Sequence, residues 1–200
     1  MIVIDRANPT HHFEQTLAFH CAPSMAGIKP ADLVCWSGCP KQALILIRSL
    51  SNDLARSGIC LRRLCSGQGR TLILVYRSTC LSRQLAQPNV ADLLMQEGYP
   101  AQRDVNTMLD HLALRMTQTG PFPHEVGLFL GYPVEDVEGF RQHGGQNFKF
   151  CGLWKVYSNV DQAKARFQQY NGCRQALCRR VQGGCPLGQI FHSGLIAQAL

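Results

Sequence analysis

The sequence lacks several features that most directly indicate function. Uninterrupted apolar runs such as Ala43 to Ile47 fall far short of the roughly 20 residues needed to cross a bilayer. Residues 1 to 25 lack the basic start and apolar stretch of a secretion signal. No glycine pattern typical of a phosphate-binding or dinucleotide-binding loop occurs. We therefore expect a cytoplasmic protein with no membrane span.

Cysteine is abundant, but it does not form the commonest cysteine motifs. The chain contains 10 cysteines and no Cys-x-x-Cys. The close pairs are spaced more widely than in zinc ribbons or thioredoxin-type motifs: Cys35/Cys39, Cys60/Cys65 and Cys173/Cys178. Without a secretion signal, these thiols are expected to be reduced, so some could be reactive or bind a metal. Cys39 precedes Pro40 at a predicted helix start, where a thiol pKa can be lowered.

Acidic residues are scarce at the end of the chain. Residues 141 to 200 contain 8 Lys or Arg and one acid, Asp161, while residues 1 to 140 contain 12 of each sign. The net charge of +7 (8 − 1) therefore arises in the last 60 residues. Such a segment can bind an acidic protein or nucleic acid, although a solvated helix has the same composition. The candidate binding cations are Lys149, Lys155, Arg174, Arg179 and Arg180.

The apolar pattern predicts one compact, mostly helical α+β or α/β domain. An N-terminal extension (residues 1 to 12) would precede the domain (13 to 182), and a tail (183 to 200) would follow it. Pro40 begins the clearest helix, which ends at Gly58. A β-hairpin is predicted near residues 59 to 77, because Ser66-Gly67-Gln68-Gly69 separates two apolar runs.

Further elements follow from local signals. Pro23 and Gly27 are expected to end a short first helix, and short helices are expected from about Ser78 and Asn89. Another helix spans Val105 to Met116. Residues 148 to 157 alternate like a strand, in which aromatic and basic side chains suit either an edge strand or stacking on bases. A final helix over 161 to 181 is expected to divide at Asn171-Gly172.

Two motifs carry the strongest signal in the chain. The first is His20-Cys21-Ala22-Pro23; the second, Phe122 to Tyr157, begins FPHEVGLFLGYP and ends CGLWKVY. Together they resemble the signature of an uncharacterised bacterial family, a domain of unknown function common in anaerobes. The resemblance covers roughly residues 13 to 182. It implies no assigned activity, so no catalytic residue follows from it.

Cys21 is the leading candidate for thiol chemistry, because a neighbouring His20 imidazolium would favour the thiolate. Adjacent residues on a helix do not face each other, so a buried structural cysteine is the competing interpretation. With His124 as base and Glu125 as the orienting acid, Cys21 could serve a hydrolase or transferase. A Pro-His-Glu helix start can equally place Glu125 at the positive end of the helix dipole.

A metal site is the alternative use of the same thiol. Cys21, His20 and Cys151 would supply thiolate and imidazole ligands for a transition metal, iron or zinc, or for haem. For a family common in anaerobes, thiol-dependent redox or iron and haem handling is the leading hypothesis. It requires that these distant segments meet in the fold.

A helix-turn-helix spacing occurs within the second motif. The apolar residues and glycines from Val126 to Phe140 match the packing positions of that motif. The second helix, however, carries Glu135, Asp136 and Glu138, which are expected to be exposed and would repel phosphate. We interpret the segment as a compact helical hairpin that does not read DNA.

Overall fold

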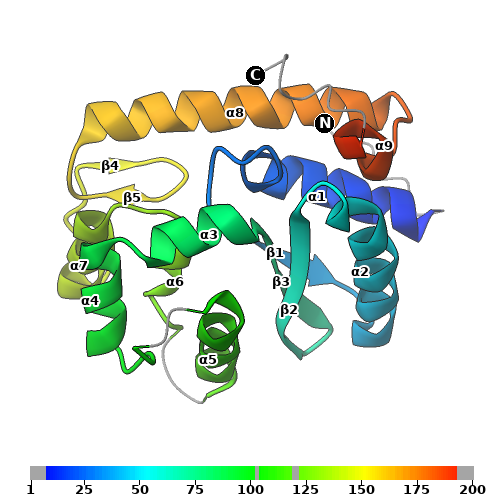
Figure 1. The fold of residues 1–200 in the computed structure, drawn as a ribbon. Helices are drawn as coiled ribbons and strands as arrows, with labels where there is room; N and C mark the ends of the chain where they lie inside the picture. The colour runs from blue at the N-terminus through cyan, green and yellow to red at the C-terminus, as the bar shows by residue number, and fades with distance from the viewer. Residues whose placement is uncertain (1–7, 102–103, 119–121, 193–200) are drawn as a thin grey trace.

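The protein is described by a computed structural model, which covers residues 8–101, 104–118 and 122–192. Within these ranges the fold is α+β and mostly helical, as predicted, around a small antiparallel sheet (Figure 1). The sheet has the strand order β1-β3-β2, formed by Ala31–Ser37 (β1), Ile59–Gly67 (β2) and Arg70–Arg77 (β3). None of the helices in these ranges is long and apolar enough to cross a membrane. The cytoplasmic location stays a prediction.

The predicted hairpin is confirmed as β2 and β3. Gln68 and Gly69 connect the two strands, and both have positive φ angles, 48° and 70°. Two such residues match the right-handed twist of the strands on either side, so a two-residue loop suffices. A register shift between Arg63 and Cys65 shows that β2 also contains a bulge.

Strand β3 separates two hydrophobic clusters, because its successive side chains face opposite sides of the sheet. Ile73 and Val75 belong to the first cluster, and Leu74 and Tyr76 belong to the second. The first cluster lies between the sheet and four helices: α1 (Pro9–Met25), α2 (Pro40–Ala55), α8 (Val160–Gln182) and α9 (Leu187–His192). Helix α9 contributes Leu187, Ile190 and Phe191 to this core.

The second cluster is covered by helices from the middle of the chain. These are α3 (Ser78–Leu85), α4 (Pro88–Gln96), α5 (Val105–Thr117), α6 (Val126–Phe129) and α7 (Val134–His143). The turn between α6 and α7 requires glycine at position 131, where φ is +75° and a Cβ atom would lie 2.6 Å from Pro30 Cδ. The helical hairpin predicted from the sequence is therefore present, with a very short first helix.

A third, smaller cluster joins a hairpin to α8. Strands β4 (Phe150–Cys151) and β5 (Lys155–Val156) form this two-stranded hairpin, which lies beneath the start of α8 in Figure 1. Trp154, Val156 and Phe167 lie in the cluster. The single strand predicted over residues 148 to 157 is therefore wrong. The chain reverses near Gly152, where a Cβ atom would lie 2.2 Å from the Phe167 ring.

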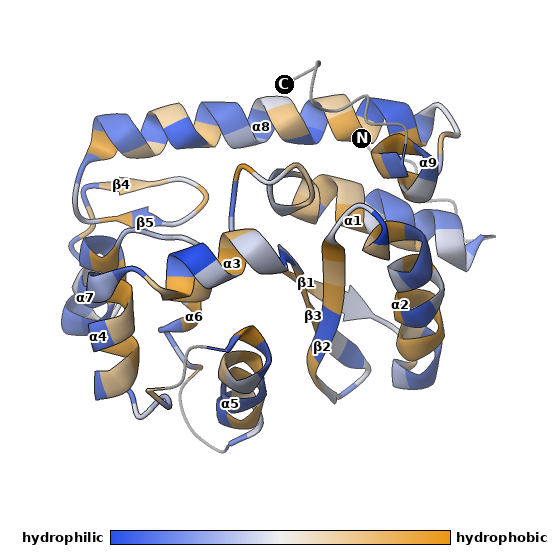
Figure 2. Ribbon diagram, in the orientation of Figure 1, coloured by the Kyte–Doolittle hydropathy of each residue, from blue (hydrophilic) through white to orange (hydrophobic). Residues whose placement is uncertain are grey.

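Two predicted helix ends are also wrong. Helix α8 runs unbroken through Asn171 and Gly172, and Figure 2 shows apolar and polar residues alternating along it. Both residues lie on its exposed face, while apolar side chains at helical spacing continue to contact the core. This packing outweighs the roughly 1 kcal/mol cost of a helical glycine. Helix α1 likewise continues through Pro23 to Met25, and the chain leaves the helix at Gly27, where φ is +79°.

One strand was not expected from the sequence. Strand β1 contains Asp32 and is flanked by Pro30 and Gly38, so it shows neither a long apolar run nor a regular alternation. Its pairing partner, β3, lies about forty residues further along the chain. The expectation of an N-terminal extension concerns residues 1–7, which lie outside the described residues, and residues 8–12, which cap and begin α1. Residues 193–200 of the expected tail also lie outside them.

Candidate ligand-binding site

A pocket of about 340 Å³ opens where α6 and α7 meet the β4–β5 hairpin. Its walls are mostly apolar and carry five aromatic rings, from Phe122, His124, Tyr132, Phe140 and Trp154. Leu153 also lines it, and the side chains of Phe122 and Leu153 are 50% and 38% exposed. A concave apolar site of this volume is typical of small-molecule sites.

The rings of the pocket hold one another in place. Tyr132 stacks on Trp154 with ring centroids 4.7 Å apart and an interplanar angle of 24°. The Phe167 ring of α8 packs edge-on against Trp154, with ring centroids 4.4 Å apart and an interplanar angle of 84°. Both are favourable aromatic geometries. The indole is 8% exposed and forms a firm wall between α8 and the pocket.

Asp136 fixes this wall to α7. Its Oδ2 accepts a 2.7 Å hydrogen bond from Trp154 Nε1, and its Oδ1 accepts the backbone N–H groups of Tyr157 and Ser158 at 2.8 and 2.7 Å. The expectation that Asp136 is exposed was wrong, because the residue is 2% exposed. Its charge lies in the first turn of α7, where the helix dipole favours an anion. Glu135 and Glu138 are exposed as expected.

Lys155 brings a positive charge to the pocket. Its Nζ donates to the carbonyl of Gly145 at 2.6 Å and lies 5.6 Å from the centroid of Phe140 and 5.1 Å from that of Phe148. An ammonium group has three donors, so the Gly145 carbonyl uses only one of them. The half-buried Lys155 can therefore contact an anionic group that enters the pocket.

A buried ion pair lies behind Tyr132. Lys29 Nζ contacts Asp32 Oδ1 at 2.5 Å, and the two side chains are 10% and 7% exposed. Burial lowers the pKa of Lys29, but the Asp32 carboxylate together with Tyr132 and Tyr170 more than offsets this effect, so the pKa of this ammonium is raised. Lys29 Nζ also lies 5.5 Å from the Tyr132 ring and 5.9 Å from the Tyr170 ring. Tyr132 thus separates a charged interior from the pocket.

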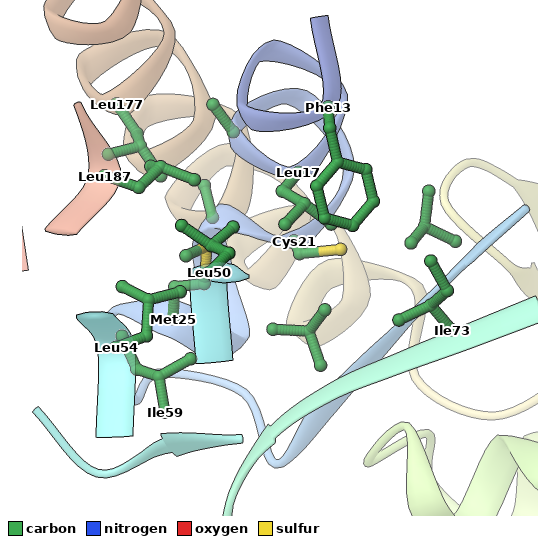
Figure 3. Close-up of a cluster of buried hydrophobic side chains, with 14 of the residues drawn as sticks. Phe13, Leu17, Cys21, Met25, Leu50, Leu54, Ile59, Ile73, Leu177 and Leu187 are labelled. Carbon is green, nitrogen blue, oxygen red and sulfur yellow. The ribbon is translucent and has the colours of Figure 1, made fainter. Parts of the chain in front are cut away.

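Cys21 lies in the first hydrophobic cluster, where its sulfur is surrounded by apolar side chains (Figure 3). The residue is 0% exposed. Burial raises the pKa of the Cys21 thiol well above its usual value, and the nearby Asp32 carboxylate raises it further. The thiol is therefore protonated and enclosed, which is the opposite of a reactive thiolate. His20, its neighbour in sequence, is exposed on another side of α1 and does not activate it.

The proposed catalytic partners of Cys21 lie in other surroundings. His124 is exposed and lines the pocket, where the centroid of its ring lies 4.8 Å from the centroid of the Phe140 ring. Glu125 is 3% exposed, and its Oε1 accepts a hydrogen bond from Tyr99 at 3.1 Å and pairs with Arg115 Nε at 2.5 Å. This carboxylate serves an ion pair between helices, and the structure lends no support to a triad.

The proposed metal ligands show a similar separation. Cys151 is exposed in β4 beside the third cluster, while Cys21 is in the first. Among residues 8–101, 104–118 and 122–192, no three His, Cys, Asp or Glu side chains come close enough to hold a metal ion. Iron, zinc or haem binding by Cys21, His20 and Cys151 therefore gains no support from the geometry.

Cys39 is the thiol with the most reactive surroundings. It is exposed at the start of α2, as its position before Pro40 suggested. The backbone N–H groups of Gln42 and Lys41 lower the pKa of its thiol, and the Lys41 ammonium acts in the same direction. A thiolate is favoured at such a helix start.

The basic residues singled out from the sequence divide into two groups. Lys149 and Lys155 belong to the hairpin region, where Lys149 Nζ donates to the carbonyl of Ser158 at 3.1 Å. Arg174, Arg179 and Arg180 belong to α8. Arg174 contacts Asn171 Oδ1 at 3.2 Å and lies over the Phe19 ring.

The pocket was not predicted from the sequence, although all five of its aromatic rings lie within the motif from Phe122 to Tyr157. Tyr132 is part of Gly-Tyr-Pro, between two predicted helices, and Trp154 is part of Cys-Gly-Leu-Trp-Lys, in the segment interpreted as an edge strand or a base-stacking strand. Tyr132 directly follows Gly131 and Trp154 lies two residues after Gly152, so an aromatic residue close to a glycine in two separate turns was the available signal. No pattern in the sequence indicates that the Tyr132 and Trp154 rings stack on each other.

Comparisons with known proteins agree with the resemblance noted from the motifs. The profile of a protein family of unknown function, DUF3793, matches residues 17–191, which is most of the chain. No curated protein and no solved structure matches the sequence. The pocket residues from Phe122 to Lys155 all lie within the matched range, as do Lys29 and Cys21. The chain therefore belongs to the family of proteins of unknown function DUF3793.

Proposed function

We propose that this domain is a ligand-binding module, and that its ligand is a small, planar, mainly apolar molecule with one negative charge. The observation that carries this proposal is the pocket of about 340 Å³ lined by five aromatic rings and Lys155. Aromatic walls favour a flat ligand that stacks on them. The Lys155 ammonium favours a carboxylate or a similar anion at one edge of that ligand.

The buried groups near the pocket support binding over chemistry. Asp136 uses its carboxylate oxygens to hold Trp154 and two backbone N–H groups, and Glu125 is paired with Arg115. Both carboxylates are thus committed to the fold. A firm aromatic wall of this kind preorganises the site, which lowers the entropic cost of ordering it around a ligand.

Two probes with similar rings and opposite charges test the proposal. Calorimetric titration with 2-naphthoate and with 2-naphthylmethylamine should show saturable binding of the carboxylate and weaker binding of the amine. Lys155→Met keeps an apolar side chain but removes the charge, so naphthoate should bind about tenfold more weakly while the amine is not weakened. Equal binding of the two probes, or saturable binding of neither, contradicts the proposal.

Two leucine substitutions provide a matched control. Leu153→Ala truncates an exposed side chain of the pocket, whereas Leu114→Ala truncates one that is 56% exposed on α5 and does not line it. Only the first should weaken naphthoate binding, by a factor of about three or more, because it removes apolar contact area. If both variants weaken binding equally, the probe does not bind in the pocket.

A further inference from the structure

Helix α8 lies along one edge of the molecule (Figure 1), and its Lys and Arg side chains make this edge basic. Its 23 residues span about 34 Å at 1.5 Å per residue. The cations are therefore spread along a line and do not converge on a point. We define the α8 basic surface as the cations of this helix (Lys164, Arg166, Arg174, Arg179 and Arg180) together with two exposed rings: Phe19 of α1, which lies beside Arg174, and Phe148, which precedes the β4–β5 hairpin.

The charge of this surface is not neutralised by the protein. None of the ion pairs formed within the described ranges includes a cation of α8. Asp161, in the first turn, is the only acid in the helix sequence and the only one in residues 141 to 200. An uncompensated line of positive charge attracts a linear polyanion, and the attraction weakens as salt is added.

Aromatic rings accompany these cations. The Arg174 guanidinium lies 4.9 Å from the centroid of Phe19, which comes from α1 and is 36% exposed. Lys164 Nζ lies 5.1 Å from the Phe150 ring of the hairpin. Phe148, which precedes that hairpin, is 38% exposed and lies beside Lys155. Exposed rings among cations are typical of sites that stack the bases of a single strand and neutralise its phosphates.

We propose that the α8 basic surface binds single-stranded nucleic acid with little sequence preference. Lys164, Arg174 and Arg179 neutralise phosphates, while Phe19 and Phe148 stack on bases. An acidic protein would satisfy the charge but would make no use of the planar ring faces. The cations proposed to contact phosphates are distinct from the cation of the small-ligand site, since Lys164, Arg174 and Arg179 do not line the pocket, whereas Phe148 lies beside the pocket residue Lys155.

The test measures fluorescence anisotropy of a labelled thymidine oligonucleotide of about 15 nucleotides over a series of salt concentrations. The triple variant Lys164→Gln, Arg174→Gln, Arg179→Gln should bind more weakly. The slope of log affinity against log salt should fall by about 2, which is three lost phosphate contacts at about 0.7 each. The matched control Arg63→Gln, Arg70→Gln, Arg83→Gln removes the same charge from exposed sites on β2, β3 and α3 and should keep most of the slope.

Substitution of the rings provides a second test, in which the affinity for the oligonucleotide is measured while the charge of the protein is unchanged. The double variant Phe19→Leu, Phe148→Leu preserves apolar bulk and charge but removes the stacking faces, so affinity for the oligonucleotide should fall about tenfold. Polyglutamate of equal total charge should compete poorly. The proposal is overturned if polyglutamate competes as well as the oligonucleotide, if the control triple variant loses as much affinity, or if the leucine variants bind normally.

Discussion

The carboxylate of Asp136 and the indole of Trp154 are joined by a 2.7 Å hydrogen bond that links α7 to the β4–β5 hairpin. The same carboxylate accepts two backbone N–H groups from the chain that leads into α8. One buried anion thus connects three elements around the pocket. The position of the pocket wall therefore depends on this side chain.

Replacement of Asp136 by alanine should destabilise the protein strongly. It would leave one indole and two backbone donors without their acceptor in a buried place, so we expect a loss of about 3 kcal/mol or more in the free energy of unfolding. Urea denaturation followed by circular dichroism measures the loss. Glu138→Ala, an exposed acid on the same helix, should change the free energy by less than about 0.5 kcal/mol. Similar losses for the two variants would refute this role.

Glu14 should make stability depend on pH. Burial raises the pKa of this carboxyl, and Asp53 adds to the rise, although the hydrogen bond from the Leu187 N–H opposes it. The folded state then holds the proton more tightly than the unfolded chain. The resulting stabilisation is present below the unfolded pKa of about 4.5 and is lost as the pH rises through the higher folded pKa.

Glu14→Gln removes this ionisation but keeps a side-chain oxygen to accept the Leu187 N–H. The variant should therefore have a higher melting temperature than the original protein at pH 8, and the difference should shrink toward pH 4.5. Calorimetric melting at the two pH values checks this. Asp92→Asn, at an exposed position of α4, is the control. An advantage of Glu14→Gln that is larger at pH 4.5 would refute the assignment.

Cys39 and Cys21 should differ greatly in reactivity. Cys39 is exposed and its thiol pKa is lowered, whereas Cys21 is fully buried and its thiol pKa is raised. Under native conditions at neutral pH, iodoacetamide should alkylate Cys39 roughly tenfold faster than Cys21, or more. Peptide mapping by mass spectrometry measures both rates. Unfolding in urea should abolish most of the difference, and rapid native labelling of Cys21 would show that the α1 core opens readily.

Gly172→Ala should stabilise the protein by about 0.5–1 kcal/mol, because Gly172 lies inside α8 and a Cβ atom would meet no neighbour within 4 Å. Chemical denaturation measures the gain. Gly152→Ala is the opposite case, since its Cβ would lie 2.2 Å from Phe167, and this variant should be destabilised. If Gly172→Ala lowers stability, α8 is not continuous in solution.

Local signals in the sequence predicted those elements whose formation depends on nearby residues. Pro40 begins α2, and Gln68-Gly69 forms the tight turn of the β2–β3 hairpin. In both cases the backbone preference of one or two residues determines the local conformation. The same reasoning failed at Asn171-Gly172, where contacts from α1 to the opposite face of α8 keep the helix intact.

Pairings between distant residues could not be predicted in this way. Glu125 looked like a catalytic acid until the structure placed Arg115 and Tyr99 beside it. Asp136 looked exposed because its sequence neighbours are acidic, yet its donors come from residues about twenty positions later. The partners of a buried carboxylate lie far away in the sequence and leave no regular pattern around it. Sequence alone therefore cannot distinguish a structural carboxylate from a reactive one.

The packing of α1 against α8 also constrains how the chain folds during synthesis. Phe13, Leu17 and Cys21 of α1 share a core with Cys173 and Leu177 of α8, although about 150 residues separate them. A ribosome extends a chain by about 5–20 residues per second. Many seconds therefore pass between the synthesis of α1 and that of α8, and the apolar face of α1 is not covered by α8 during this time. During that interval the nascent protein exposes an unfinished core, which makes it a natural client for chaperones that shield apolar segments.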